Sequence, residues 1–107
     1  MDEAKFEKMA HEELRDLEEK LIDVDPDDIE VTSSDGVLTL ELRDGVRVVI
    51  NSHRAARQIW MAAVASAWKF SYDAERQRWG TEGQKSLEFR ETLRTLIEDR
   101  IGLQLAL

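Results

Sequence analysis

The chain has 107 residues, 42% of them hydrophobic, and no cysteine, which fits a single globular domain over residues 1–107 and excludes disulfides and thiolate chemistry. Its formal net charge of −8 is concentrated at one end, because residues 1–30 hold thirteen acidic and four basic side chains. Such a negative field disfavours binding to nucleic acid or an anionic membrane and favours binding to cations or a basic protein surface. No apolar run approaches the roughly 18 residues that span a bilayer, so we expect a cytoplasmic protein.

Residues 3–24 have the periodicity of an amphipathic helix. Apolar side chains recur every three or four positions and form one stripe, which consists of Phe6, Met9, Ala10, Leu14, Leu17, Leu21 and Val24. Asp2 is the predicted N-cap, and Pro26 stops the helix. The stripe predicts that one side of this helix packs on a core.

The middle of the chain has the pattern of an antiparallel meander. Alternating residues between turn signals predict six short strands, at residues 29–32, 37–42, 46–51, 58–63, 68–72 and 78–79. Asp44-Gly45 is the sharpest hairpin signal. The fourth segment is rich in alanine, so a helix is an alternative there.

Helical spacing returns over residues 86–100, with Ser86 as the predicted N-cap and Gly102 as the stop. The leucines at 103, 105 and 107 are expected to lie in a groove between the two helices. Together these elements predict an α+β fold, a two-layer sandwich with two helices on one face of a five- or six-stranded antiparallel sheet. The other face of the sheet is then free for a partner.

Acidic residues gather on the first helix and continue beyond it. On a helical wheel, four of them fall within about 60° on the side away from the apolar stripe, with a fifth beside them and four more in the following loop and strand. This set is Glu12, Asp16, Glu18, Glu19, Asp23, Asp25, Asp27, Asp28 and Glu30. A solvated helix face is the alternative interpretation, but the run passes the helix end and contains no base between positions 23 and 30.

Water-facing carboxylates suit hard cations such as Fe²⁺, Mn²⁺, Mg²⁺ or Ca²⁺, with weak affinity and poor selectivity. The spacing of an EF-hand is absent. His11 is interpreted as a surface residue, with help to a metal as the alternative, and His53 as part of a contact surface or of none. No nucleophile elbow, phosphate loop or zinc-protease motif occurs, so we expect no enzyme.

A second candidate site lies on the predicted open face of the sheet. Alternation from Ile50 and Ile59 places Asn51, Gln58 and Trp60 on that face. Two amides beside an indole are typical of a protein contact surface. The alternative is that long neighbours such as Arg47 half-cover the indole.

The order of these features resembles the frataxin family in its bacterial form. The resemblance rests on the acidic helix and its Asp-rich link, followed by Gly36-Val37-Leu38-Thr39-Leu40, Asp44-Gly45, Val49-Ile50-Asn51, Gln58-Ile59-Trp60, Phe70, Trp79 and a closing amphipathic helix. Asn51 followed seven residues later by Gln58 is its most specific part. Two departures are Ile22, where bacterial relatives often have an acid, and Ser66-Ala67, where a glycine is expected.

The resemblance implies an accessory protein of iron–sulfur cluster assembly with the same sandwich fold. Family members bind iron weakly along the first helix and adjoining strand edge, dock this surface on the cysteine desulfurase, and meet the cluster scaffold protein with the open sheet face. By position, the first surface corresponds to Glu18, Glu19, Asp23, Asp25, Asp27, Asp28 and Glu30, and the second to Asn51, Gln58 and Trp60.

Three functions remain as hypotheses. The first is an iron-binding modulator of cluster assembly, and the second is an interaction module for which iron is incidental. A ferroxidase is less favoured, because no buried di-iron ligand set is present in the sequence. We expect a monomer, with iron-driven oligomers as the alternative.

Overall fold

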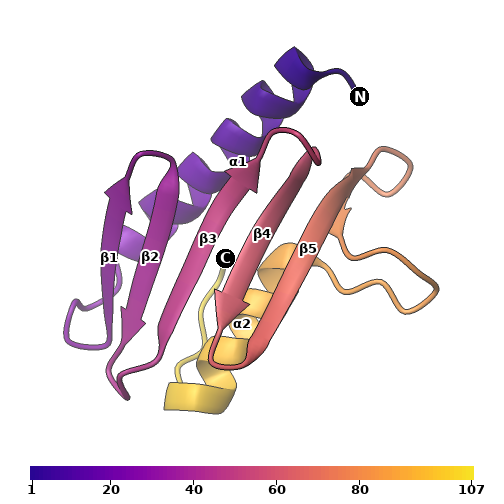
Figure 1. The fold of residues 1–107 in the computed structure, drawn as a ribbon. Coiled ribbons are helices and arrows are strands. Elements are labelled where there is room, and N and C mark those ends of the chain that lie inside the picture. The colour runs from indigo at the N-terminus through magenta and orange to yellow at the C-terminus, as the bar shows by residue number, and fades with distance from the viewer.

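The computed structural model describes residues 1–107 as two helices and six strands (Figure 1). Their bounds are α1 Glu3–Ile22, β1 Ile29–Ser34, β2 Val37–Leu42, β3 Arg47–His53, β4 Gln58–Ala63, β5 Ser66–Asp73, β6 Arg78–Gly80 and α2 Phe89–Ile101. The strands form one antiparallel sheet in the order β1 to β6. The predicted α+β sandwich is confirmed, and both helices lie on the same face of the sheet. Neither helix has the length and apolar composition that crossing a bilayer requires.

The core lies between the sheet and the helices and follows from the alternation of the strands. Leu38, Leu40 and Leu42 of β2 are all buried, and so are Ile59 and Met61 of β4. Burial of each large apolar side chain contributes about 1.5–3 kcal/mol. Because successive strand residues point to opposite faces, the partly exposed residues between them form the uncovered face of the sheet.

The predicted element boundaries hold closely at α1 and β4. Lys5 N donates to Asp2 Oδ1 at 2.7 Å, which confirms Asp2 as the N-cap of α1. The helix ends at Ile22, two residues earlier than predicted. The helical alternative for residues 58–63 is wrong, because β4 pairs with β3 on one side and β5 on the other.

The start of α2 was predicted three residues too early. Its N-cap is Glu88, whose carboxylate accepts hydrogen bonds from Arg90 N and Glu91 N, and not Ser86. The chain before Glu88 is extended along the sheet edge, where Thr81 N donates to Leu87 O at 2.9 Å. Pairing with this edge prevents a helical conformation at residues 86–87.

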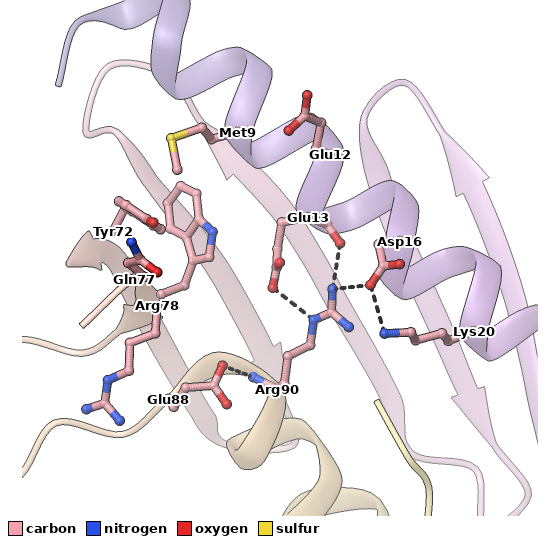
Figure 2. Close-up of a pocket in the computed structure, with 11 residues that line it drawn as sticks. Met9, Glu12, Glu13, Asp16, Lys20, Tyr72, Gln77, Arg78, Glu88 and Arg90 are labelled. Atoms are coloured by element: carbon pink, nitrogen blue, oxygen red, sulfur yellow. Dashed lines mark hydrogen bonds and ion pairs between the residues drawn. The ribbon is translucent and has the colours of Figure 1, made fainter. Parts of the chain in front are cut away.

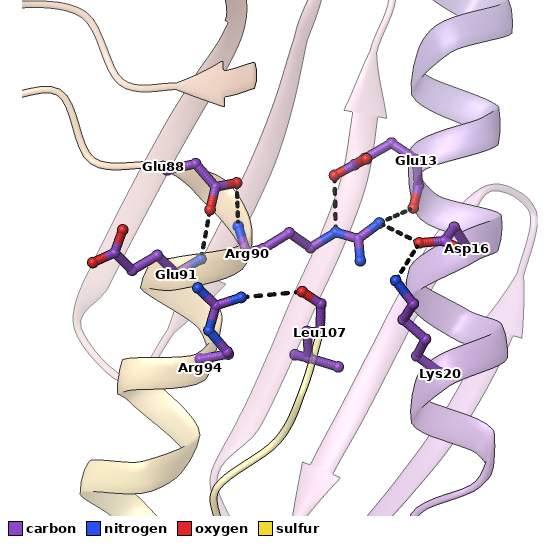
Figure 3. Close-up of polar contacts among 8 residues, drawn as sticks. All are labelled: Glu13, Asp16, Lys20, Glu88, Arg90, Glu91, Arg94 and Leu107. Carbon is purple, nitrogen blue, oxygen red and sulfur yellow. Dashed lines mark hydrogen bonds and ion pairs between the residues drawn. The ribbon is translucent and has the colours of Figure 1, made fainter. Parts of the chain in front are cut away.

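The last residues lie between α1 and α2, as predicted, with the C-terminus on the helical side of the sheet (Figure 1). Leu103, Leu105 and Leu107 are partly buried against the core. Arg94 of α2 donates from Nη1 to Leu107 O at 3.0 Å, which fixes the end of the segment (Figure 3).

Candidate functional site

The predicted acidic residues lie on α1, the α1–β1 loop and the start of β1, and we call this set the acidic ridge. Its members are Glu12, Asp16, Glu18, Glu19, Asp23, Asp25, Asp27, Asp28 and Glu30. Seven of the nine are exposed, and Glu18 and Asp28 are half-buried. None is tucked into the core, so the ridge faces water over its whole length.

The loop of the acidic ridge is held in shape by its own hydrogen bonds. Asp27 N donates to Asp25 Oδ1 at 2.9 Å, in the manner of an Asx turn. Asp28 N and Ile29 N both donate to Asp25 O, at 2.8 and 3.1 Å. Asp25 therefore organises the turn that leads from α1 into β1, and its neighbours Asp23 and Asp27 project from a fixed backbone.

Asp28 is paired within the protein. The stretch from position 23 to 30 contains no base of its own, but Arg43 Nη1 donates to Asp28 Oδ1 at 2.7 Å. The same guanidinium donates to Ile101 O at the end of α2. A base fifteen residues away in sequence is brought beside the loop by the β1–β2 pairing, which a helical wheel does not represent.

Asp16 is the second internally paired member: it is exposed, as the helical wheel predicts, but it has two cationic partners in the protein. Lys20 Nζ lies 3.0 Å from Asp16 Oδ2, and Arg90 Nη2 of α2 donates to the same oxygen at 3.0 Å (Figure 3). Hydrogen bonds from Lys20 and then Arg90 hold the pKa of the Asp16 carboxyl below its usual value. This carboxylate therefore joins the two helices.

Arg90 is the centre of that contact and was not singled out from the sequence. Its Nε donates to Glu13 Oε2 at 2.8 Å and its Nη2 to Glu13 O at 3.1 Å. Burial of Arg90 opposes its charge, but the bonds to Glu13 and Asp16 outweigh this effect and raise its pKa. The depression of about 520 Å³ beside these residues is lined in part by Glu13, Asp16, Lys20, Glu88 and Arg90, which are bonded to one another (Figure 2).

Six members of the acidic ridge have no cationic partner in the protein. Glu19 pairs with Arg15 through an exposed contact of 3.4 Å, and Asp16 and Asp28 are paired as described. The unpaired members are Glu12, Glu18, Asp23, Asp25, Asp27 and Glu30. No three acidic or histidine side chains converge on one point. A cation held here would have one or two carboxylate ligands and otherwise water, which corresponds to weak binding of a hard ion.

The sheet patch, which we define as Asn51, Gln58 and Trp60, lies together on the open face, as alternation predicts. Asn51 is directly opposite Trp60 in the β3–β4 ladder, and all three side chains are half-buried. Trp60 Nε1 donates to Gln58 Oε1 at 3.0 Å, and Gln58 Nε2 donates to Ser71 Oγ at 3.2 Å. The polar groups are thus satisfied within the sheet, and the indole is held in one orientation.

His53 and Lys69 complete this patch. The sequence left His53 as part of a contact surface or of none, and Lys69 was not singled out. The His53 ring stacks on Trp60 with centroids 3.9 Å apart and planes at 10°, and Lys69 Nζ is 4.8 Å from the indole centroid. The alternative of a half-covered indole therefore holds, but the covering residues are His53 and Lys69, whereas Arg47 pairs with Glu41. The register supplies the missing signal, because Lys69 is directly opposite Trp60.

The fold and these two surfaces define a class of small α+β sandwich that combines an acidic first helix with an uncovered antiparallel sheet. A family model for the frataxin-like domain matches residues 1–103. The chain therefore belongs to the frataxin family, as the resemblance of the sequence indicated.

Individual relatives agree with this assignment. The iron–sulfur cluster assembly protein CyaY of Pseudomonas fluorescens (strain Pf0-1) is 30% identical over 107 residues, covering 97% of this chain and 93% of that protein. CyaY of Thioalkalivibrio sulfidiphilus is 38% identical over 80 residues, covering 74% and 75%. A solved frataxin from Psychromonas ingrahamii matches with a TM-score of 0.85 and 21% identity over 98% of this chain and 96% of that one, which supports the fold.

Proposed function

We propose that this protein is an accessory factor of iron–sulfur cluster assembly that docks through the unpaired part of the acidic ridge on a basic surface of the cysteine desulfurase. The observation that carries the proposal is the row of carboxylates without internal cations, on a chain whose relatives are named iron–sulfur cluster assembly proteins. Charge complementarity of this kind raises the association rate and fixes orientation, and it weakens as salt is added.

Ferrous or ferric iron is the proposed weak ligand of the same surface. Exposed carboxylates match the preference of hard cations for oxygen. Asp23, Asp25 and Asp27 are the best placed, because they are unpaired and the loop that bears them is fixed by internal hydrogen bonds. A neutralising cation would also reduce the charge that attracts a basic partner, so iron and desulfurase are expected to influence each other's binding.

The open sheet face is the proposed contact for the cluster scaffold protein. Trp60 offers a rigid aromatic surface whose polar atom is already bonded to Gln58. Aromatic anchors held in one rotamer lose little entropy on association. The two partners would then meet different parts of the sandwich and could bind together.

The second candidate is an interaction module whose iron binding has no role, and it is favoured by the lack of any converging ligand set. We propose no catalytic activity in either case. Calorimetric titration of the desulfurase with this protein, at low and high salt and with and without Fe²⁺, tests both. Binding that weakens with salt supports docking, and an affinity that Fe²⁺ leaves unchanged would favour the second candidate. No binding at low salt would refute both.

A further inference from the structure

The outer edge of β1 has backbone groups with no partner. Arg43 N donates to Asp28 O at 2.9 Å, which makes Asp28 part of the β1–β2 ladder. Because bonded pairs alternate along an antiparallel ladder, even-numbered residues of β1 direct their backbone groups to β2, and Val31 and Ser33 direct theirs outward. No element lies beyond β1 in the sheet (Figure 1).

At the opposite edge of the sheet, β6 covers only the last three residues of β5, and the uncovered part of β5 carries Lys69, whereas the whole length of β1 is open. Beyond β6, Gly80 forms a bridge with Glu88, and Thr81 N donates to Leu87 O at 2.9 Å. Edge strands are commonly protected by lysine, proline or a bulge. The sequence of β1 contains no lysine or proline, and its register with β2 is unbroken over six residues.

The helix flank beside β1 offers room for side chains of an added strand. A groove of about 970 Å³ lies between α1 and the sheet and reaches from Ser33 of β1 to Ser52 of β3, with Glu18 of α1 among its lining residues. Ile22 follows Glu18 by one turn on the same flank and is 68% exposed. An apolar side chain that points toward the helices would therefore meet Ile22.

The charges around this edge select the kind of strand that could join it. Glu30 projects from β1 toward the open face, Glu18 lies on the helix flank, and neither has an internal cation. A second copy would bring the same carboxylates against these, so self-pairing is opposed by like charges. A segment that alternates basic and apolar residues would place its basic side chains near Glu30 on the open face and its apolar side chains toward the helices.

We propose that the free edge of β1 takes up an extended, basic segment of a partner protein as a seventh strand. Main-chain hydrogen bonds to Val31 and Ser33 would supply affinity, and the carboxylates and Ile22 would supply selectivity. The inference rests on the docking role proposed above, because it uses the same ridge, and it adds that docking includes backbone pairing as well as charge.

The test uses the full-length, ¹⁵N-labelled protein and a synthetic octapeptide of alternating arginine and valine. The matched control peptide has the same sequence and charge but N-methyl groups on the amides of one edge, so it cannot pair on that side. We expect the first peptide to slow amide hydrogen exchange at Val31 and Ser33. We expect the N-methylated peptide to bind about tenfold or more weakly, because it loses main-chain hydrogen bonds to β1.

Two variants sharpen this comparison. Val31→Pro removes an outward N–H that does not bond to β2, and it is expected to weaken binding of the peptide about tenfold. Val31→Ala keeps this N–H, so its affinity for the peptide should stay within about twofold of the wild type. Equal binding of both peptides with unchanged exchange at Val31 and Ser33 would overturn the proposal. If hydrogen exchange at these amides slows when the protein is concentrated without any peptide, a second copy of the chain is the occupant of the edge. That result would also overturn the proposal.

The proposal and the docking role can fail separately. Peptide pairing at β1 together with no binding of the cysteine desulfurase would sustain the edge site and refute the desulfurase as partner. Desulfurase binding that Val31→Pro leaves unchanged, but that neutralisation of Glu18, Asp23, Asp27 and Glu30 weakens, would sustain docking by charge and refute strand addition.

Discussion

Arg90 of α2 reaches across to α1 and donates from Nε to Glu13 Oε2 at 2.8 Å, joining two residues that are 77 positions apart. Its guanidinium is largely buried, with 11% of the side chain exposed. The contact ties the helices together on the side away from β1 and leaves the groove side of α1 open. The contact that stabilises the fold and most of the proposed docking surface therefore lie on different flanks of the same helix, with Glu12, beside the Arg90 depression, as the exception.

Replacing Arg90 by alanine should destabilise the fold. The change leaves the Glu13 carboxylate without its half-buried partner, and we expect a loss of about 1–3 kcal/mol in the free energy of unfolding. Urea unfolding measures this directly. In a double-mutant cycle, Glu13→Gln should cost much less in the Arg90→Ala background than in the wild type, whereas additive costs would contradict the coupling.

Stability should depend on pH through Asp16. Because the pKa of Asp16 is lowered in the folded protein, first by Lys20 and then by Arg90, its contribution is complete above the usual value of 3.8 and is lost as pH falls below it. Asp16→Asn should therefore be less stable than the wild type at neutral pH, and the difference should shrink in acid. Asp99→Asn, at an exposed residue with no ion pair, is the control. A difference that persists unchanged in acid would be evidence against this assignment.

His53→Ala should loosen the indole of Trp60. Loss of a stacked ring is worth about 0.5–1.5 kcal/mol beyond the area it buries, and the ring current of His53 on the indole disappears with it. The Nε1–H resonance of Trp60 should shift and its exchange should accelerate. Trp68 and Trp79 serve as internal references in the same spectrum, and a change of equal size at all three would indicate a global effect instead.

The β4–β5 turn stores strain at Val64, which has a φ of +56° and an exposed side chain. A β-branched residue is disfavoured in this region, whereas glycine adopts it freely. Val64→Gly should raise the free energy of unfolding by about 0.5–1.5 kcal/mol. Val64→Ala, which keeps a Cβ, should gain less, and thermal unfolding of both variants measures the difference.

The fold could be predicted from local patterns, because β2, β3 and β4 alternate between buried and more exposed residues and each helix has one apolar stripe. Asn51 and Trp60 could be placed on one face for the same reason. The errors occurred where distant segments meet. Arg43 and Arg90, which lie on other elements, pair with Asp28 and Asp16. Pairing of the chain before α2 with the end of β6 moves the start of α2 to Phe89. Local periodicity predicts neither effect.

The turn after β4 is another feature that the sequence predicted only in part. The absence of glycine near Ser66-Ala67 was visible in the sequence, but the residue that adopts the left-handed conformation is Val64. The strand register decides which residue occupies that position, since Ala63 pairs with Ser66 and leaves only two residues for the turn.

The most direct test of the account compares two variants of equal net charge. The ridge variant carries Glu18→Gln, Asp23→Asn, Asp27→Asn and Glu30→Gln, which removes carboxylates without internal partners. The control carries Glu75→Gln, Glu82→Gln, Glu91→Gln and Asp99→Asn, four exposed positions elsewhere. Affinity for the cysteine desulfurase at low salt should fall at least about tenfold for the first and stay within about twofold for the second. Equal affinities of the two variants would contradict the claim that the unpaired ridge is the docking surface.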